Sequence, residues 1–232
     1  MIGSTEKRSH LFDGSFGFHS ITEEHNTMSI LEFVKGLNWS IVLLFTLLYL
    51  YQGFYLVVGL LLRRHKDRHE PSRLHRFAVV VSARNEEQVI GELLDSLRKQ
   101  NYPQELLDLY VVADNCTDDT AGAARKAGAF VYERRDPIHK GKGYAMDYLF
   151  RQLKEEGKDC YDGYFVFDAD NLVDPNFVRE MNRTFDKGYD AVTCYRNSKN
   201  FGDNWISAGY SIWFLREARF LNFPRTLLGT NC

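Results

Sequence analysis

The sequence predicts an α/β domain with a mainly parallel sheet and flanking helices, preceded by one transmembrane helix. From Phe77 onward, short apolar runs alternate with stretches of helical periodicity, which is the pattern of βαβ units. Polar, turn-forming residues follow each of the early apolar runs. Before the domain, residues 39–62 form a long run without formal charge. These observations indicate the order of segments along the chain.

The predicted organisation has a tail, a membrane helix, a linker and one domain. Within the domain, apolar runs predict strands, and apolar residues at helical spacing predict helices. The segments are a polar N-terminal tail (1–38), a transmembrane helix (39–62), a basic linker (63–76) and the α/β domain (77–232). The predicted strands are 77–81, 109–113, 130–132, 164–167 and 191–195, and the predicted helices are 87–100, 117–127, 143–156 and 176–187.

Composition excludes several classes of protein. Of the 232 residues 26% are charged and the formal net charge is −2, so the chain lacks the basic character of a nucleic-acid-binding protein. The cysteines have no zinc-binding spacing and are expected to be reduced thiols. They are Cys116, Cys160, Cys194 and Cys232.

The apolar run 39–62 is long enough to cross a bilayer, which takes about 20 residues. Gln52 is its only strongly polar side chain, and Trp39 lies at one end, where interfacial aromatic residues gather. A buried soluble helix rarely stays apolar on all sides for this length. A cleaved signal peptide would be shorter and closer to Met1. A membrane span is therefore favoured over both alternatives.

The charges that flank this run predict its orientation. Arg63, Arg64, Lys66 and Arg68 follow it directly, whereas only Lys35 lies close before it. Since positive residues stay on the cytoplasmic side, the domain is expected to face the cytoplasm from the cell membrane.

Asp168-Ala169-Asp170 directly follows the apolar run 164–167. Mg²⁺ is usually held by one or two carboxylates together with substrate phosphates. Ligands of open α/β sheets bind outside the carboxyl ends of the strands. A single Asp-x-Asp sequence after a strand is common, so the interpretation as a metal site depends on the neighbouring motifs.

Three further polar motifs follow the earlier predicted strands. Ser-Ala-Arg-Asn-Glu occupies 82–86, Ala-Asp-Asn-Cys-Thr-Asp-Asp-Thr occupies 113–120, and His-Lys-Gly-Lys-Gly occupies 139–143. The carboxyl ends of parallel strands share one end of the sheet, so these motifs are expected to converge there.

With these motifs the chain resembles the family 2 glycosyltransferases of GT-A fold, from about Phe77 to Asn231. Within the family it resembles the membrane-bound synthases of poly-N-acetylglucosamine, cellulose and hyaluronan. The resemblance implies a GT-A domain that takes a UDP-sugar, such as UDP-N-acetylglucosamine or a related hexose donor, and a glycan or lipid acceptor.

The resemblance also implies roles for single residues. The backbone at Ala83 and the side chain of Glu86 would hold the nucleoside, and Asp114 would accept a hydrogen bond from the uracil ring. An Asx turn is the alternative role for Asp114. Ala113 stands where the family often has another aspartate, which leaves nucleotide selectivity open. Thr117 is expected to cap the next helix rather than contact substrate, and Asp118 shares this expectation.

The diphosphate would be bound by Lys142 and by the two aspartates. Asp168 would face the donor sugar or the ribose, and Asp170 would ligate Mg²⁺ or Mn²⁺, with Asp168 beside it. A solvated surface lysine is the alternative for Lys142, and more so for Lys140. The implied reaction is inverting transfer by direct displacement.

No residue is assigned as the general base. In the family a Gly-Thr-Asn-like segment, here 229–231, leads into a half that carries the base, so the chain is expected to be incomplete at its C-terminus. Glu217 and Asp203 lie in the right region of sequence, but nothing nominates them.

Two other functions remain open. A sugar-nucleotide-binding module without catalysis would fit the missing base. A nucleotidyltransferase would need a glycine-rich phosphate loop after the first strand, which 83–86 does not supply.

The aromatic-rich segment 206–221 predicts a core helix or an amphipathic helix at the membrane surface, with the core favoured.

Overall fold

The computed structural model describes residues 15–61 and 70–230, with side chains from Ser29 onward. The chain divides into two compact units. One combines Met1–Arg63 with Ile212–Cys232, and the other is Arg64–Ser211. The start of the predicted tail (1–14), Leu62 and most of the predicted linker (63–69) lie outside the described residues.

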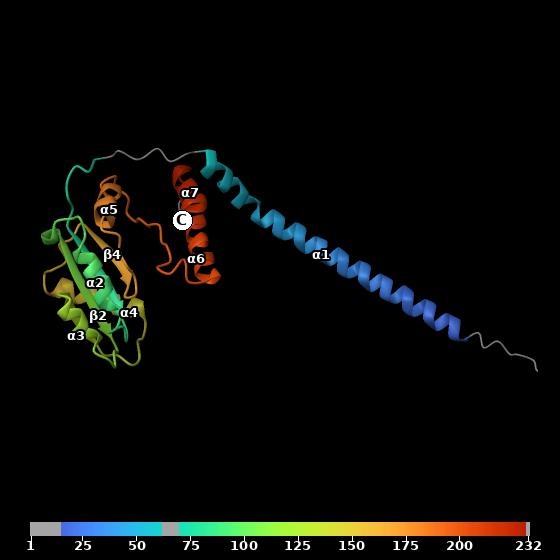
Figure 1. The fold of residues 1–232 in the computed structure, drawn as a ribbon, viewed down its shortest axis with the longest axis horizontal. Helices are drawn as coiled ribbons and strands as arrows, with labels where there is room; N and C mark the ends of the chain where they lie inside the picture. Colours follow the sequence, from blue (N-terminus) through green and yellow to red (C-terminus); the bar gives the residue numbers. More distant parts are fainter. Residues whose placement is uncertain (1–14, 62–69, 231–232) are drawn as a thin grey trace, which may run out of the picture. The chain divides into compact units, whose positions relative to one another are not determined.

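The second unit is built on a parallel four-stranded sheet with the order β3-β2-β1-β4 (Figure 1). All four predicted N-terminal strands are present, so the predicted α/β class with a parallel sheet is confirmed. The central strand β1 is buried along its length, as expected for a strand covered on both faces. The strands are β1 (Phe77–Ala83), β2 (Leu107–Asp114), β3 (Phe130–Arg134) and β4 (Gly163–Asp168).

Helices cover both faces of this sheet, because alternate residues of each strand point to opposite sides. Val79 and Val81 of β1 pack with Leu94 in the larger core, on the face of α2, α3 and α5. Val80 packs with Leu149 on the opposite face, beneath α4. The helices are α2 (Ile90–Arg98), α3 (Thr120–Lys126), α4 (Lys142–Glu155) and α5 (Phe177–Phe185), and the short 3₁₀ turn η1 (Gln104–Leu106) precedes β2.

The predicted fifth strand is wrong. Residues 191–195 have no regular secondary structure, and β4 is the last strand on its side of the sheet. The apolar pattern of this segment is that of a strand, but a strand forms only where its backbone pairs with a neighbour.

The first unit contains the long helix α1 (Ser15–Leu61). It begins inside the predicted tail 1–38, so the helix is longer than the apolar run alone predicts. Ser29–Leu61 qualifies by length and composition as a membrane span, with a mean hydropathy of 2.1 and none of its most apolar window buried. The unit also holds the C-terminal part of α6 (Trp205–Arg216), then η2 (Glu217–Asn222), a π-helical stretch, and α7 (Phe223–Leu227).

Gly128 joins α3 to β3 in a conformation that favours glycine, with φ at +80°. Arg98 donates to the carbonyls of Ala127 (2.6 Å) and Gly128 (2.9 Å), and a Cβ at position 128 would overlap its guanidinium group. We expect Gly128→Ala to lower the free energy of unfolding by about 2 kcal/mol, from strain plus displacement of Arg98.

Gly157→Ala is the matched control for this prediction. Gly157 also has a positive φ, at +63°, but a Cβ there meets nothing within 4 Å. Only the backbone strain of about 1 kcal/mol applies. Denaturant unfolding of the full chain in detergent compares the two variants, and equal losses would show that Arg98 contributes nothing.

Candidate functional site

The strand register brings the predicted site residues to one end of the sheet. Ser82 of β1 pairs with Asp168 of β4, and Ala83 pairs with Ala113 of β2. Asp114 follows Ala113 and ends β2. The carboxyl ends of all four parallel strands lie at this end, which is where open α/β sheets bind ligands.

The Asp168-Ala169-Asp170 turn presents its two carboxylates to solvent. Ala169 between them is buried in the larger core, whereas Asp168 and Asp170 are exposed. The turn is tethered further on, where the N–H of Val173 donates to Ser96 Oγ at 3.1 Å. The alternation of exposed and buried residues therefore directs both carboxylates away from the core.

These two carboxylates fit a hard divalent cation. Among the residues described, the Asp170 carboxylate accepts only one hydrogen bond, at 3.1 Å from Asn171 Nδ2 to its Oδ1. The residues that the structure describes include no group of three or more His, Cys, Asp or Glu side chains that could hold a metal by themselves. The protein thus offers two carboxylate ligands, and a bound diphosphate would complete the set that Mg²⁺ or Mn²⁺ prefers.

Lys142 lies beside this turn, with its Nζ 2.5 Å from Asp168 Oδ1. It is the first residue of α4, and the preceding Gly141 has φ at +121° and provides no side-chain cap. The first N–H groups of α4 are therefore open to an anion. A hollow of about 430 Å³ adjoins them, lined by Lys140, Gly141, Gly143, Tyr144 and Asp147.

The loop after β1 is locked to the loop after β2. Asn85 has a left-handed backbone, with φ at 57°, and its side-chain oxygen accepts from the N–H of Thr117 at 2.8 Å. The N–H of Glu86 donates to Thr120 Oγ1 at 2.9 Å. Glu86 is half-buried. Strained non-glycine residues of this kind cluster at functional sites, and Asn tolerates the conformation best.

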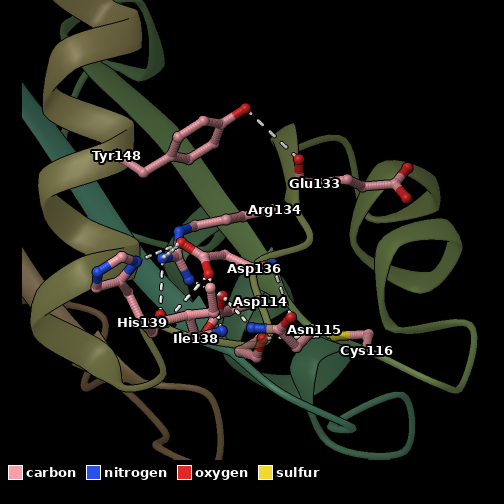
Figure 2. Close-up of polar contacts among 10 residues, drawn as sticks. Asp114, Asn115, Cys116, Glu133, Arg134, Asp136, Ile138, His139 and Tyr148 are labelled. Atoms are coloured by element: carbon pink, nitrogen blue, oxygen red, sulfur yellow. Dashed lines mark hydrogen bonds and ion pairs between the residues drawn. The ribbon is translucent and has the colours of Figure 1, made fainter.

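Asp114 is buried and already bound by protein groups (Figure 2). Its Oδ1 accepts from Arg134 Nη1 at 2.7 Å and from Asn115 Nδ2 at 2.9 Å. Among the described residues none donates to Oδ2, so one carboxylate oxygen remains for a ligand. The structure shows neither an Asx turn here nor a freely exposed carboxylate, but a buried ion pair.

Arg134 extends this network into the loop between β3 and α4 (Figure 2). Its Nη2 donates to the carbonyl of His139 at 2.7 Å and to Asp136 Oδ2 at 3.0 Å. Asn115, also left-handed with φ at 53°, accepts from the N–H of Asp136 at 2.9 Å. The sequence motifs missed Arg134 and Asp136, which together connect the end of β2 to the loop that leads to Lys142.

Asp136 organises this loop through backbone hydrogen bonds. The N–H groups of His139 and Ile138 donate to its Oδ1 at 3.0 and 2.9 Å, and with the His139 side chain they lower the pKa of its carboxyl to about 2. A carboxyl whose pKa is lower in the folded state stabilises the fold above its unfolded pKa and loses that contribution as pH falls.

We therefore expect Asp136→Asn to destabilise the chain at neutral pH but not near pH 2. The stability that the carboxylate contributes is complete above its ordinary pKa of 3.8 and is lost as pH falls toward about 2. Unfolding midpoints of wild type and variant should converge across this range. A difference that stays constant with pH would contradict the assigned role.

The cap of α3 differs from the expectation. Neither Thr117 nor Asp118 caps the helix; the cap is Asp119, whose Oδ1 accepts from the N–H of Gly122 at 3.1 Å. Asp118 instead accepts from the hydroxyl and N–H of Thr120. These bonds, the hydroxyl first, lower the pKa of the Asp118 carboxyl.

A known structure shares this architecture. The mannosyltransferase PcManGT of Pyrobaculum calidifontis, solved with GDP-Man and Mn²⁺, matches with a TM-score of 0.50 and 19% identity, over 79% of this chain and 53% of that one. Staphylococcus aureus TarS 1–349 with UDP-GlcNAc matches with a TM-score of 0.41 and 20% identity, over 53% of this chain and 38% of that one. The first of these supports a GT-A-like fold.

Sequence comparison adds a curated relative and a family. The 4,4'-diaponeurosporenoate glycosyltransferase of S. aureus is 36% identical over 92 residues, which is 39% of this chain and 24% of the relative. The chain thus spans about a quarter of the length of that relative. The family model described as "Glycosyltransferase like family 2" matches residues 75–227, which include every strand of the sheet. The chain therefore belongs to glycosyltransferase family 2.

Proposed function

We propose that this glycosyltransferase domain takes a UDP-sugar, with UDP-N-acetylglucosamine or a related hexose donor preferred, and transfers the sugar with inversion to a glycan or lipid acceptor. The observation that carries the proposal is the convergence of Asp114, Lys142, Asp168 and Asp170 at the carboxyl end of one parallel sheet. A nucleoside diphosphate needs a contact for its base, a cation and donors for its phosphates, and these residues can supply all three.

Asp168 and Asp170 are the groups that would hold Mg²⁺ or Mn²⁺. The bound ion would supply charge stabilisation for the departing nucleoside diphosphate. Lys142 lies 2.5 Å from Asp168, so its ammonium group can exchange that carboxylate for a donor phosphate. The uncapped N–H groups at the start of α4 add hydrogen-bond donors on the same side. The Mn²⁺ in the structure of the mannosyltransferase PcManGT accords with a divalent ion in this fold.

Uridine selectivity is assigned to Asp114. Its Oδ1 is taken by Arg134 and Asn115, and Oδ2 is left to accept the N–H of a uracil ring. The pair with Arg134 fixes the position of the carboxylate, and a carboxylate acts only as a hydrogen-bond acceptor. Ala83 and the half-buried Glu86 end the neighbouring strand and are assigned to the nucleoside.

The domain is proposed to be anchored in the cell membrane by α1 and to face the cytoplasm. The described part of α1 is long and apolar enough to span a bilayer, and its large hydrophobic side chains are exposed. The basic residues after Leu61 predict the cytoplasmic side.

The second candidate is a sugar-nucleotide-binding module, favoured by the absence of an assigned general base among the described residues. Both candidates are tested by UDP release from UDP-N-acetylglucosamine and UDP-glucose, with Mn²⁺ or Mg²⁺, by the protein in its own membranes. Release of UDP that requires the ion supports transfer. Metal-dependent binding of UDP without release, even with acceptor glycans present, would replace the transferase by the binding module.

A further inference from the structure

The C-terminal segment 212–230 packs against the last turns of α1 within the first unit. Gly59 lies at the contact: a Cβ there would stand 3.1 Å from Pro224 Cγ and 3.3 Å from the carbonyl oxygen of Arg219. The small residue thus allows the two helical segments to approach closely, as small residues do between helices in membranes.

Polar groups of the two segments are also paired. Arg216 Nη2 donates to Gln52 Oε1, and Gln52 is the only strongly polar side chain of the apolar run. The guanidinium of Arg225 lies over the ring of Tyr55, 5.3 Å from its centroid, and the Tyr55 hydroxyl is 3.3 Å from Thr230 Oγ1. Polar side chains inside a bilayer need partners, and this segment provides them.

If α1 spans the membrane, these contacts lie on the cytoplasmic side of its midpoint, and Gly59 lies nearest to the bilayer surface. Gln52 precedes Leu61, the last described residue of α1, by nine positions, or about 14 Å of helix at 1.5 Å per residue. The hydrocarbon core is about 30 Å thick, so the contacts fall in the cytoplasmic half of the bilayer and its headgroup layer.

The exposed side chains of this segment suit the same layer. Its exposed apolar residues include Trp213, and its arginines, opposed by a single acidic residue, give a net positive charge. Trp and Leu with arginine are the composition of helices that lie in the membrane interface. The exposed apolar residues are Ile212, Trp213, Leu215, Leu227 and Leu228, the arginines are Arg216, Arg219 and Arg225, and the acidic residue is Glu217.

We propose that 212–230 is a second membrane-binding element, which lies in the cytoplasmic interface, contacts anionic lipid headgroups through its arginines and is held there by packing on α1 at Gly59. This inference rests on the proposed membrane anchor. It favours the membrane surface over a core for the part of 206–221 from Ile212 onward, because Ile212, Trp213 and Leu215 are exposed.

Depth-dependent tryptophan quenching tests the proposal. The chain has three tryptophans, Trp39, Trp205 and Trp213. The variant Trp39→Phe/Trp205→Phe leaves Trp213 as the only indole, and both replaced side chains are exposed, so the fold is preserved. The full chain is reconstituted in vesicles of phosphatidylcholine and phosphatidylglycerol, with bromines on the acyl carbons nearest the headgroups. Interfacial helices bury their apolar face about 5–10 Å, which is within reach of these bromines.

The variant Trp205→Phe/Trp213→Phe retains Trp39 and reports on α1 itself. We expect brominated lipid to quench Trp213 at least as strongly as Trp39. Quenching of Trp39 without quenching of Trp213 would overturn the proposal and leave the anchor intact. If neither indole is quenched, the anchor fails and this inference fails with it.

Gly59→Leu in the variant that retains only Trp213 tests whether packing on α1, and not the composition of 212–230 alone, holds the segment at the interface. The added side chain would collide with Pro224 and Arg219, so we expect Trp213 quenching to fall and its accessibility to aqueous iodide to rise. Gly53→Leu is the control, because a Cβ at Gly53 meets nothing within 4 Å. Equal quenching in the two variants would show that α1 does not hold the segment at the interface.

Discussion

Asp170→Ala is expected to remove the metal-dependent part of UDP binding. Among the described residues Asp170 accepts only from the neighbouring Asn171, whereas Asp168 is paired with Lys142. Loss of a residue that hydrogen-bonds to a metal ligand lowers the affinity for the metal about 10–100-fold. Loss of a direct ligand should therefore lower it at least about 100-fold. Electron paramagnetic resonance of Mn²⁺ in the presence of UDP measures the bound ion directly.

Asp159→Ala is the matched control for this variant. Asp159 is an exposed aspartate that precedes β4. Asp168 is the last residue of β4 and Asp170 comes shortly after it, so Asp159 and Asp170 lie at opposite ends of the strand. The control should bind Mn²⁺ and UDP like wild type. Unchanged Mn²⁺ binding by Asp170→Ala would contradict the assignment of the metal site.

Arg134→Ala is expected to lower the free energy of unfolding by about 3–5 kcal/mol, because it leaves the buried carboxylate of Asp114 without its ionic partner. The side chains of Arg134 and Asp114 are only 9% and 4% exposed, and their atoms are 2.7 Å apart. The same change frees Asp136 and the His139 carbonyl from Arg134, so the loop before α4 should also exchange amide hydrogens faster.

An exposed pair provides the comparison. Arg151 and Asp147 form an ion pair on α4, with side chains 68% and 59% exposed, and Arg151→Ala should cost only about 0–1 kcal/mol. Asp114→Asn in the Arg134→Ala background removes the unpaired charge and should recover part of the loss. If the double variant is no more stable than Arg134→Ala alone, the cost does not come from the buried charge.

The positions of the predicted site residues followed from the sequence because they depend on a local rule. Each apolar run predicts a parallel strand, and each strand must deliver the residue after it to the same end of the sheet. Asp114, Asp168 and Lys142 therefore lie where the sequence places them, although none of the comparisons tests their roles.

Other features of the fold and the site depend on tertiary contacts, which the pattern of apolar and polar residues in the sequence does not encode. Arg134 ends a short strand like any exposed arginine, and only the register opposite Asp114 makes it a buried partner. The segment 191–195 has the composition of a strand but no strand beside it. Asn85 and Asn115 become recognisable only through their positive φ angles, which let each side chain join two loops.

Calorimetric titration of the full chain with UDP and GDP, with and without Mn²⁺, tests the central claim most directly. Binding of UDP that weakens at least about tenfold when Mn²⁺ is chelated, together with weaker binding of GDP, is the predicted result, since removal of the ion leaves the diphosphate only Lys142 and backbone donors. Equal affinity for UDP and GDP would contradict the role of Asp114, and UDP binding that ignores Mn²⁺ would contradict the metal–diphosphate site at Asp168 and Asp170.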